Sequence, residues 1–148
     1  MKHVIILRGA SGSGKSTYAE KLCKDIKGGY IIVSADHFFT SSTGKYAFNH
    51  AQLGTAHAVC MKNFVQAVTR ECPTIIVDNT NTRLHEISPY RQVALAYDYE
   101  VEIIRTVCGA TEAYRRNIHG VPEHTISAQT KRMEKLPRFW EKETLVYT

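Results

Sequence analysis

The sequence predicts an α/β fold in which a parallel sheet of four to five strands carries helices on both faces. Short, nearly all-apolar runs recur along the chain, as expected of strands that a parallel sheet buries on both sides. Between these runs, apolar residues return with helical spacing, so strand and helix alternate. A glycine-rich loop joins the first apolar run to the first helical stretch, which is the third observation in favour of this fold.

The predicted elements follow one another in a regular order. Strands are expected over residues 3–7, 30–34, 74–78 and 99–105, and a short fifth strand over 145–147. Helices are expected over residues 15–26, 49–70, 86–97, 111–119 and 125–135. A chain of 148 residues is long enough for a single core. We therefore expect one domain over residues 1–148, with a short helical lid over 111–125.

The glycine-rich loop has the sequence of a phosphate-binding loop. Residues 9–16 read Gly-Ala-Ser-Gly-Ser-Gly-Lys-Ser, which is the G-x-x-x-x-G-K-[ST] pattern between a predicted strand and a predicted helix. Its glycines permit backbone angles that side chains forbid, so the N–H groups can surround an anion. The helix that follows directs its positive end at the same phosphates. This motif in this context predicts a P-loop NTPase fold.

The loop also predicts which residues bind the cofactors, ATP or GTP together with Mg²⁺. The residues expected to bind the nucleotide are Gly9, Ala10, Ser11, Gly12, Ser13, Gly14, Lys15, Ser16 and Thr17. Lys15 is expected to reach the β- and γ-phosphates and to act in catalysis, and Ser16 to ligate Mg²⁺.

Polar residues at the ends of the second and third strands should face the same crevice, because ligands bind there in open α/β sheets. The Asp36 carboxylate can accept a proton from a hydroxyl nucleophile or hold Mg²⁺ through water. The alternative is an aspartate that caps the segment after it. Asp78 ends the third strand after three apolar residues and is predicted to order the Mg²⁺ shell. Asn79, Thr80 and Asn81 fit substrate binding and turn formation equally well.

Two further segments carry candidate residues. Arg115 and Arg116 lie on the helix predicted after the fourth strand, where a lid arginine can neutralise the charge of a transferring phosphoryl group. The alternative is a pair of solvated helix arginines, and the nearby His119 is interpreted as a surface residue. Lys45 and Tyr46 are the candidates for contacts to an acceptor's backbone and base, although their segment could equally pack into the core.

Charge and composition limit the class of partner. The net charge is +5, with +6 over residues 1–70, −4 over 71–104 and +3 over 105–148. Basic ends favour a polyanionic ligand, and a solvated face without a partner fits almost equally well. No apolar run reaches the roughly 20 residues that span a bilayer, so no membrane partner is expected. The four cysteines are widely spaced and form no Cys-x-x-Cys, which indicates reduced thiols and a cytoplasmic location.

Taken together, these motifs resemble the kinase domain of the phage-type polynucleotide 5′-hydroxyl kinases and of related small P-loop kinase-like proteins. The resemblance rests on GASGSGKST, Ser-x-Asp after the second strand, Asp-x-Thr-Asn after the third, and Arg-Asn followed by Val-Pro and Arg-Met. It implies that Asp36 is the general base toward a 5′-hydroxyl, that Asp78 organises the site, and that Arg116 grips the donor phosphates. This chain departs from the pattern of the phage enzymes at two positions. Phe38 stands where those enzymes have an arginine that contacts the acceptor phosphate, and His119 stands where they have a second basic lid residue.

The expected function is therefore an ATP- and Mg²⁺-dependent transfer of the γ-phosphate to the 5′-hydroxyl of a polynucleotide, with a nucleic-acid 5′ end as the acceptor. Phe38 instead favours a smaller or less charged acceptor, so a small-metabolite kinase remains an alternative. A second alternative is a nucleotide-binding NTPase module that transfers nothing. Such a module would not need Asp36, so substituting this residue distinguishes a catalyst from a binder.

Overall fold

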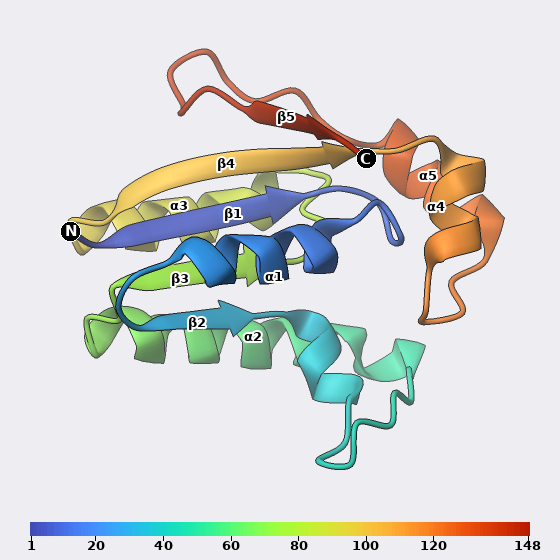
Figure 1. The fold of residues 1–148 in the computed structure, drawn as a ribbon, viewed down its shortest axis with the longest axis horizontal. Coiled ribbons are helices and arrows are strands. Elements are labelled where there is room, and N and C mark those ends of the chain that lie inside the picture. The colour runs from blue at the N-terminus through green and yellow to red at the C-terminus, as the bar shows by residue number, and fades with distance from the viewer.

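Five parallel strands form a single sheet in the order β2-β3-β1-β4-β5 (Figure 1). The structure is a computed structural model that describes residues 1–148. The strands are β1 (His3–Arg8), β2 (Tyr30–Val33), β3 (Thr74–Asp78), β4 (Glu100–Val107) and β5 (Thr144–Tyr147). The predicted fold class is confirmed, and the fifth strand is present at the edge beside β4.

Helices cover both faces of this sheet (Figure 1). They are α1 (Lys15–Asp25), α2 (Leu53–Thr69), α3 (Leu84–Ala96), α4 (Ala110–Arg116) and α5 (Glu123–Lys131). Successive residues of β1 point to opposite faces, as the pleat of a strand requires. Val4 and Ile6 are buried in the larger apolar cluster, with residues of α2 and α3, whereas Ile5 and Leu7 are buried in a second cluster with residues of α1.

Most element boundaries differ from those predicted by a few residues, and two of the larger differences have a clear cause. The helix predicted from residue 49 begins as a short 3-10 turn, because the Asn49 side chain accepts a hydrogen bond from the Ala51 N–H at 3.0 Å. The α-helix itself begins at Leu53. The helix predicted over 111–119 ends at Arg116, because the Asn117 side chain bonds to the backbone of Tyr114 and Val121 instead. A 3-10 helix, η1 (Ala35–Phe39), follows β2 and was not predicted.

The buried Arg8 joins the end of β1 to segments far along the chain. Its guanidinium donates to the carbonyl oxygens of Asn81, Thr82 and Glu134 and pairs with the Glu143 carboxylate. Burial lowers the pKa of Arg8, and the hydrogen bond to Glu143 counteracts this shift. This contact fixes the turn after β3 and the segment before β5 against the centre of the sheet.

The carboxyl ends of the strands all lie at one edge of the sheet. The glycine-rich loop, η1 and the turn after β3 leave the sheet there, and the helices α4 and α5 stand beside the same edge after β4 (Figure 1). The C-terminus lies at this end as well, and the N-terminus at the opposite one. None of the helices has the length and apolar character that crossing a membrane requires.

Candidate active site

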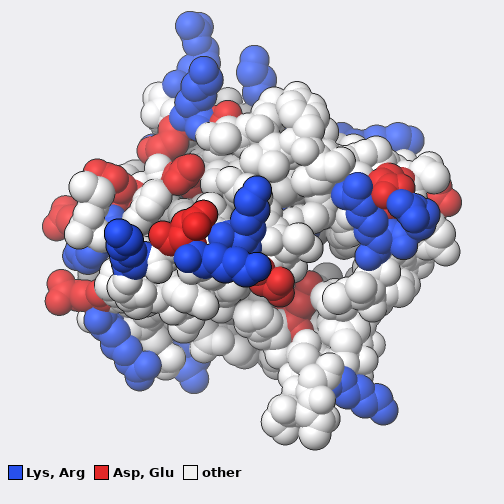
Figure 2. Space-filling view, in the orientation of Figure 1, with Lys and Arg blue, Asp and Glu red and all other residues white.

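A cavity of about 640 Å³ lies at the carboxyl ends of the strands. Its walls come from the glycine-rich loop and α1, from Asp36 in η1, from residues 78–80 at the end of β3, from residues 116–119 of the lid and from residues 146–148. Figure 2 shows the surface hollowed between the body of the molecule and the charged group on the lid, with acidic atoms inside the hollow. Residues separated by more than 100 positions in the sequence thus meet around one space.

The glycine-rich loop has the backbone geometry that its sequence predicts. Gly12 and Gly14 have φ angles of 76° and 97°, in the left-handed region that favours glycine. A Cβ on Gly12 would lie 1.9 Å from the carbonyl oxygen of Ala113, so the first lid helix packs directly on the loop. Gly14 is the N-cap of α1, so the helix begins at Lys15 with its N-terminus at the cavity.

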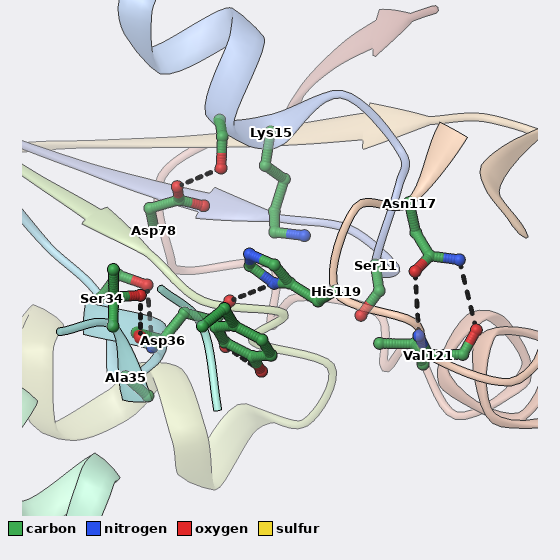
Figure 3. Close-up of polar contacts among 12 residues, drawn as sticks. Ser11, Lys15, Ser34, Ala35, Asp36, Asp78, Asn117, His119 and Val121 are labelled. Carbon is green, nitrogen blue, oxygen red and sulfur yellow. Dashed lines mark hydrogen bonds and ion pairs between the residues drawn. The ribbon is translucent and has the colours of Figure 1, made fainter. Parts of the chain in front are cut away.

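Lys15, Ser16 and Asp78 line the cavity close to one another, and Figure 3 shows Lys15 and Asp78 there. The Lys15 ammonium donates to the carbonyls of Gly9 at 2.9 Å and Ala10 at 3.1 Å. Burial lowers the pKa of Lys15, while the carboxylates of Asp78 and Asp36 raise it and oppose that shift. The Ser16 hydroxyl donates to Asp78 Oδ2 at 2.9 Å. A hydroxyl and a carboxylate oxygen held this close fit Mg²⁺, which takes one or two protein oxygens together with substrate phosphates.

Asp36 faces the cavity from η1, and it does not act as a cap. The Ser34 hydroxyl caps this helix by accepting from the Asp36 N–H at 3.2 Å, and the Asp36 carboxylate is half-exposed. Its Oδ1 lies 3.4 Å from the Tyr46 hydroxyl and its Oδ2 lies 3.5 Å from His119 Nδ1. Burial and the nearby carboxylate raise the pKa of Tyr46 to about 12, so the hydroxyl keeps its proton and donates to Asp36.

His119 does not lie on the open surface, contrary to the sequence interpretation. Its ring stacks on that of Tyr46, with centroids 4.0 Å apart and an angle of 8° between the planes. His119 lines the cavity together with Asp36. The sequence gives no sign of this, because the lid reaches η1 only through the tertiary fold.

The three residues after Asp78 differ in their surroundings. Thr80 and Asn79 line the cavity, although the buried Asn79 amide already accepts from the Ala35 N–H at 2.8 Å. Asn81 lies outside the cavity lining and is 2% exposed, and its amide donates to the Leu7 carbonyl at 2.8 Å. Its φ of 47° is a left-handed conformation that asparagine tolerates. For Asn81 the structure supports turn formation, and it does not support the predicted contact with substrate.

The two lid arginines also have different surroundings. Both pair with Glu112 and lower the pKa of that carboxyl to about 2. Arg116 also donates to the Thr148 hydroxyl at 3.2 Å and lines the cavity. The Arg115 side chain is 74% exposed and lies outside the lining. Lys45 is exposed and likewise does not line the cavity.

Several residues of the cavity wall were not singled out in the sequence. They include Tyr18 and Lys21 on α1, Ile118 on the lid, Val146 and Tyr147 in β5, and Thr148 after it. Thr148 is held there because its hydroxyl donates to the Ser13 carbonyl at 2.8 Å. The position of α1 directly after the glycine-rich loop could have indicated Tyr18 and Lys21, whereas nothing local indicates the residues of β5.

The family follows from comparison with known proteins. A model of the AAA domain family matches residues 4–136, and this chain belongs to that family. With its glycine-rich loop and five-stranded parallel sheet, the chain is a P-loop kinase-like nucleotide-binding domain. It is 34% identical over 142 residues to human NEDD4-binding protein 2, covering 92% of this chain. The chain spans only 8% of the length of that human protein.

Solved structures share the fold at low sequence identity. A chain of the Pnkp1/Rnl/Hen1 RNA repair complex is similar with a TM-score of 0.71 and 17% identity, over 89% of this chain and 44% of that one. Chaetomium thermophilum Kti12 in complex with ADP-AlF3 gives a TM-score of 0.69 and 14% identity, over 97% of this chain and 88% of that one. A gluconokinase from Sinorhizobium meliloti 1021 gives a TM-score of 0.65 and 16% identity, over 98% of this chain and 82% of that one.

Proposed function

We propose that this chain is an ATP- and Mg²⁺-dependent phosphotransferase that moves the γ-phosphate of ATP to the 5′-hydroxyl of a polynucleotide. The observation that carries the proposal is the position of Asp36. Its carboxylate lines the same cavity as Lys15 and the Ser16–Asp78 pair, and no helix cap occupies it. A carboxylate in that position can take a proton from an acceptor hydroxyl, a step that a module that only binds nucleotide does not require. We also propose that residues 1–148 act as one domain, because one sheet joins all five strands.

The donor side of the cavity would hold the triphosphate. The backbone N–H groups of the glycine-rich loop and the N-terminus of α1 would surround the phosphates, and Lys15 would contact the β- and γ-phosphates. Ser16 and Asp78 would hold Mg²⁺, which neutralises charge on the phosphate oxygens when bound. Arg116 is placed to contact the same phosphates from the lid, because it lines the cavity.

The acceptor side would supply the base. Asp36 takes the proton from the acceptor hydroxyl as that oxygen forms its bond to the γ-phosphorus. The bond between the γ-phosphorus and the oxygen that bridges to the β-phosphate breaks, and ADP leaves with that electron pair. Lys15 and Arg116 would stabilise the charge that spreads over the transferred group.

A polynucleotide acceptor agrees with the net charge of +5 and with the aromatic rings beside Asp36. The sequence resemblance to the polynucleotide 5′-hydroxyl kinases points the same way. A specific observation favours the small-metabolite alternative, because Phe38 packs against the core and η1 presents no cation two residues after Asp36. The likeness to a gluconokinase agrees with that alternative as well.

A panel of acceptors separates these two functions. We would measure transfer from γ-labelled ATP to 5′-hydroxyl RNA, 5′-hydroxyl DNA, nucleosides and small alcohols including gluconate, with Lys15→Ala as the inactive control. We expect an oligonucleotide to be the best acceptor and its KM to rise with salt, because a bound polyanion releases counterions. Labelling of a small alcohol, with no labelling of any oligonucleotide, would replace the proposal by the metabolite kinase.

A further inference from the structure

The stacked pair of Tyr46 and His119 stands beside the candidate base. The two rings come from segments 73 positions apart and lie nearly parallel, with centroids 4.0 Å apart. Tyr46 follows η1 in the sequence and lies outside the cavity lining, whereas His119 belongs to the lid and lines the cavity. An acceptor that brings its hydroxyl to Asp36 therefore arrives next to both rings.

Both carboxylate oxygens of Asp36 face this pair. The Tyr46 hydroxyl lies 3.4 Å from Oδ1 and His119 Nδ1 lies 3.5 Å from Oδ2. These contacts are long, and hydrogen bonds weaken at such separations. An acceptor hydroxyl can replace one of them at little cost and then occupies the position from which Asp36 takes its proton.

Each of the two rings lies on a loop that contains a glycine in the left-handed region. Gly44 and Gly120 have φ angles of 84° and 69°, and a Cβ added to either would meet nothing within 4 Å. Both glycines and both rings lie outside the helices and strands. Tyr46 is paired with Thr40 in an antiparallel bridge, so separating the rings by the thickness of one ring would require the loop that carries His119 to move.

We propose that Tyr46 and His119 form the two walls of an acceptor subsite, and that the base of the acceptor's 5′-terminal nucleotide inserts between them. His119 then determines specificity for the proposed reaction, on which this inference rests. A planar base gains two aromatic faces, and its sugar hydroxyl lies next to Asp36. A small acceptor without a ring gains nothing from the pair.

Stacking can be measured without any transfer of phosphate. An oligonucleotide with 2-aminopurine at its 5′ end is titrated with the protein, because the emission of this base is quenched when it stacks. We expect quenching with the wild type and with His119→Phe, which keeps an aromatic ring, and a loss of quenching with His119→Ala. The matched control is His124→Ala, since His124 is an exposed lid histidine outside the cavity lining.

Kinetics with and without the terminal base give the second readout. For an acceptor with its 5′-terminal base, His119→Ala should raise KM by about 5- to 150-fold, the loss expected for one base-to-ring stack. For an acceptor whose terminal nucleotide is abasic, the same change should leave KM unaltered. Transfer with equal KM values for both acceptors, in both proteins, would overturn the subsite and leave the proposed function intact. Quenching that depends on His119, without transfer, would instead overturn the proposed function and retain the subsite.

Discussion

Asn79 shows at the residue scale how the fold supports the candidate base. Its amide accepts from the Ala35 N–H at 2.8 Å, and its Nδ2 lies 3.5 Å from the Cys60 sulfur. The Tyr90 hydroxyl contacts the same sulfur at 3.2 Å, and burial raises the pKa of the Cys60 thiol, so the thiol stays neutral. Because Ala35 directly precedes Asp36, we infer that Asn79 positions the start of η1. Of the roles open to Asn79 from the sequence, the structure thus supports a structural one.

Replacing Asn79 should therefore lower stability and catalysis together. Asn79→Leu leaves the Ala35 N–H buried without an acceptor, which costs about 1–3 kcal/mol in the free energy of unfolding. We expect the urea midpoint to fall and kcat to fall with it, because Asp36 loses its support. Thr80→Val is the matched control, since Thr80 lines the cavity and its side chain makes no hydrogen bond within the fold. An unchanged midpoint combined with a higher acceptor KM would mean that Asn79 contacts the substrate directly.

At the scale of elements, the helix α4 determines which lid arginine faces the cavity. Arg115 and Arg116 are neighbours on the same short helix and share Glu112 as a partner. Successive residues on a helix point in directions about 100° apart, so only one of them can face a given cavity. Arg116 faces this cavity, and Arg115 remains in solvent.

The two arginines should accordingly respond differently to substitution. Arg116→Ala removes a charge that acts mainly in the transition state, so kcat should fall by about 10²–10³-fold, with a smaller effect on ATP affinity. Arg115→Ala removes the same charge from the same helix and should change kcat by less than about twofold. Steady-state kinetics of both variants, with ATP binding measured separately, provides the check. Equal losses in the two variants would show that the lid contributes only net charge.

Strands and helix ends differ in how clearly the sequence marks them. The central strands β1 and β3 could be predicted because they are buried on both faces and therefore consist of nearly continuous apolar runs. Helix ends were predicted less well, since the side chains of Asn49 and Asn117 bond to the backbone in ways that periodicity does not reveal. Asp36 and Asp78 could be assigned to one site because the carboxyl ends of parallel strands meet at one edge of the sheet. His119 could not, because it approaches Asp36 only through the packing of the lid.

For the whole molecule, the order of the strands explains why residues from distant parts of the chain line one cavity. β1 lies between β3 and β4, so the glycine-rich loop has the Asp78 turn on one side and the lid on the other. β5 adds the last residues of the chain beside the same loop. In the proposed function, the donor and acceptor sides would thus lie on different walls of one space, which is the arrangement that direct transfer of a phosphoryl group requires.

The most direct test of this account compares wild type with Asp36→Asn in a single turnover. The transfer of the labelled γ-phosphate from ATP to a 5′-hydroxyl oligonucleotide is followed over time, and the affinity for ATP is measured for both proteins. The substitution keeps the shape of the side chain and removes the proton acceptor. We predict label on the oligonucleotide with the wild type, and a rate lower by about 10²–10⁴-fold with Asp36→Asn at unchanged ATP affinity. Equal rates in the two proteins, or a loss of ATP binding that matches the loss of rate, would contradict the assignment of Asp36 as the base in a phosphotransferase.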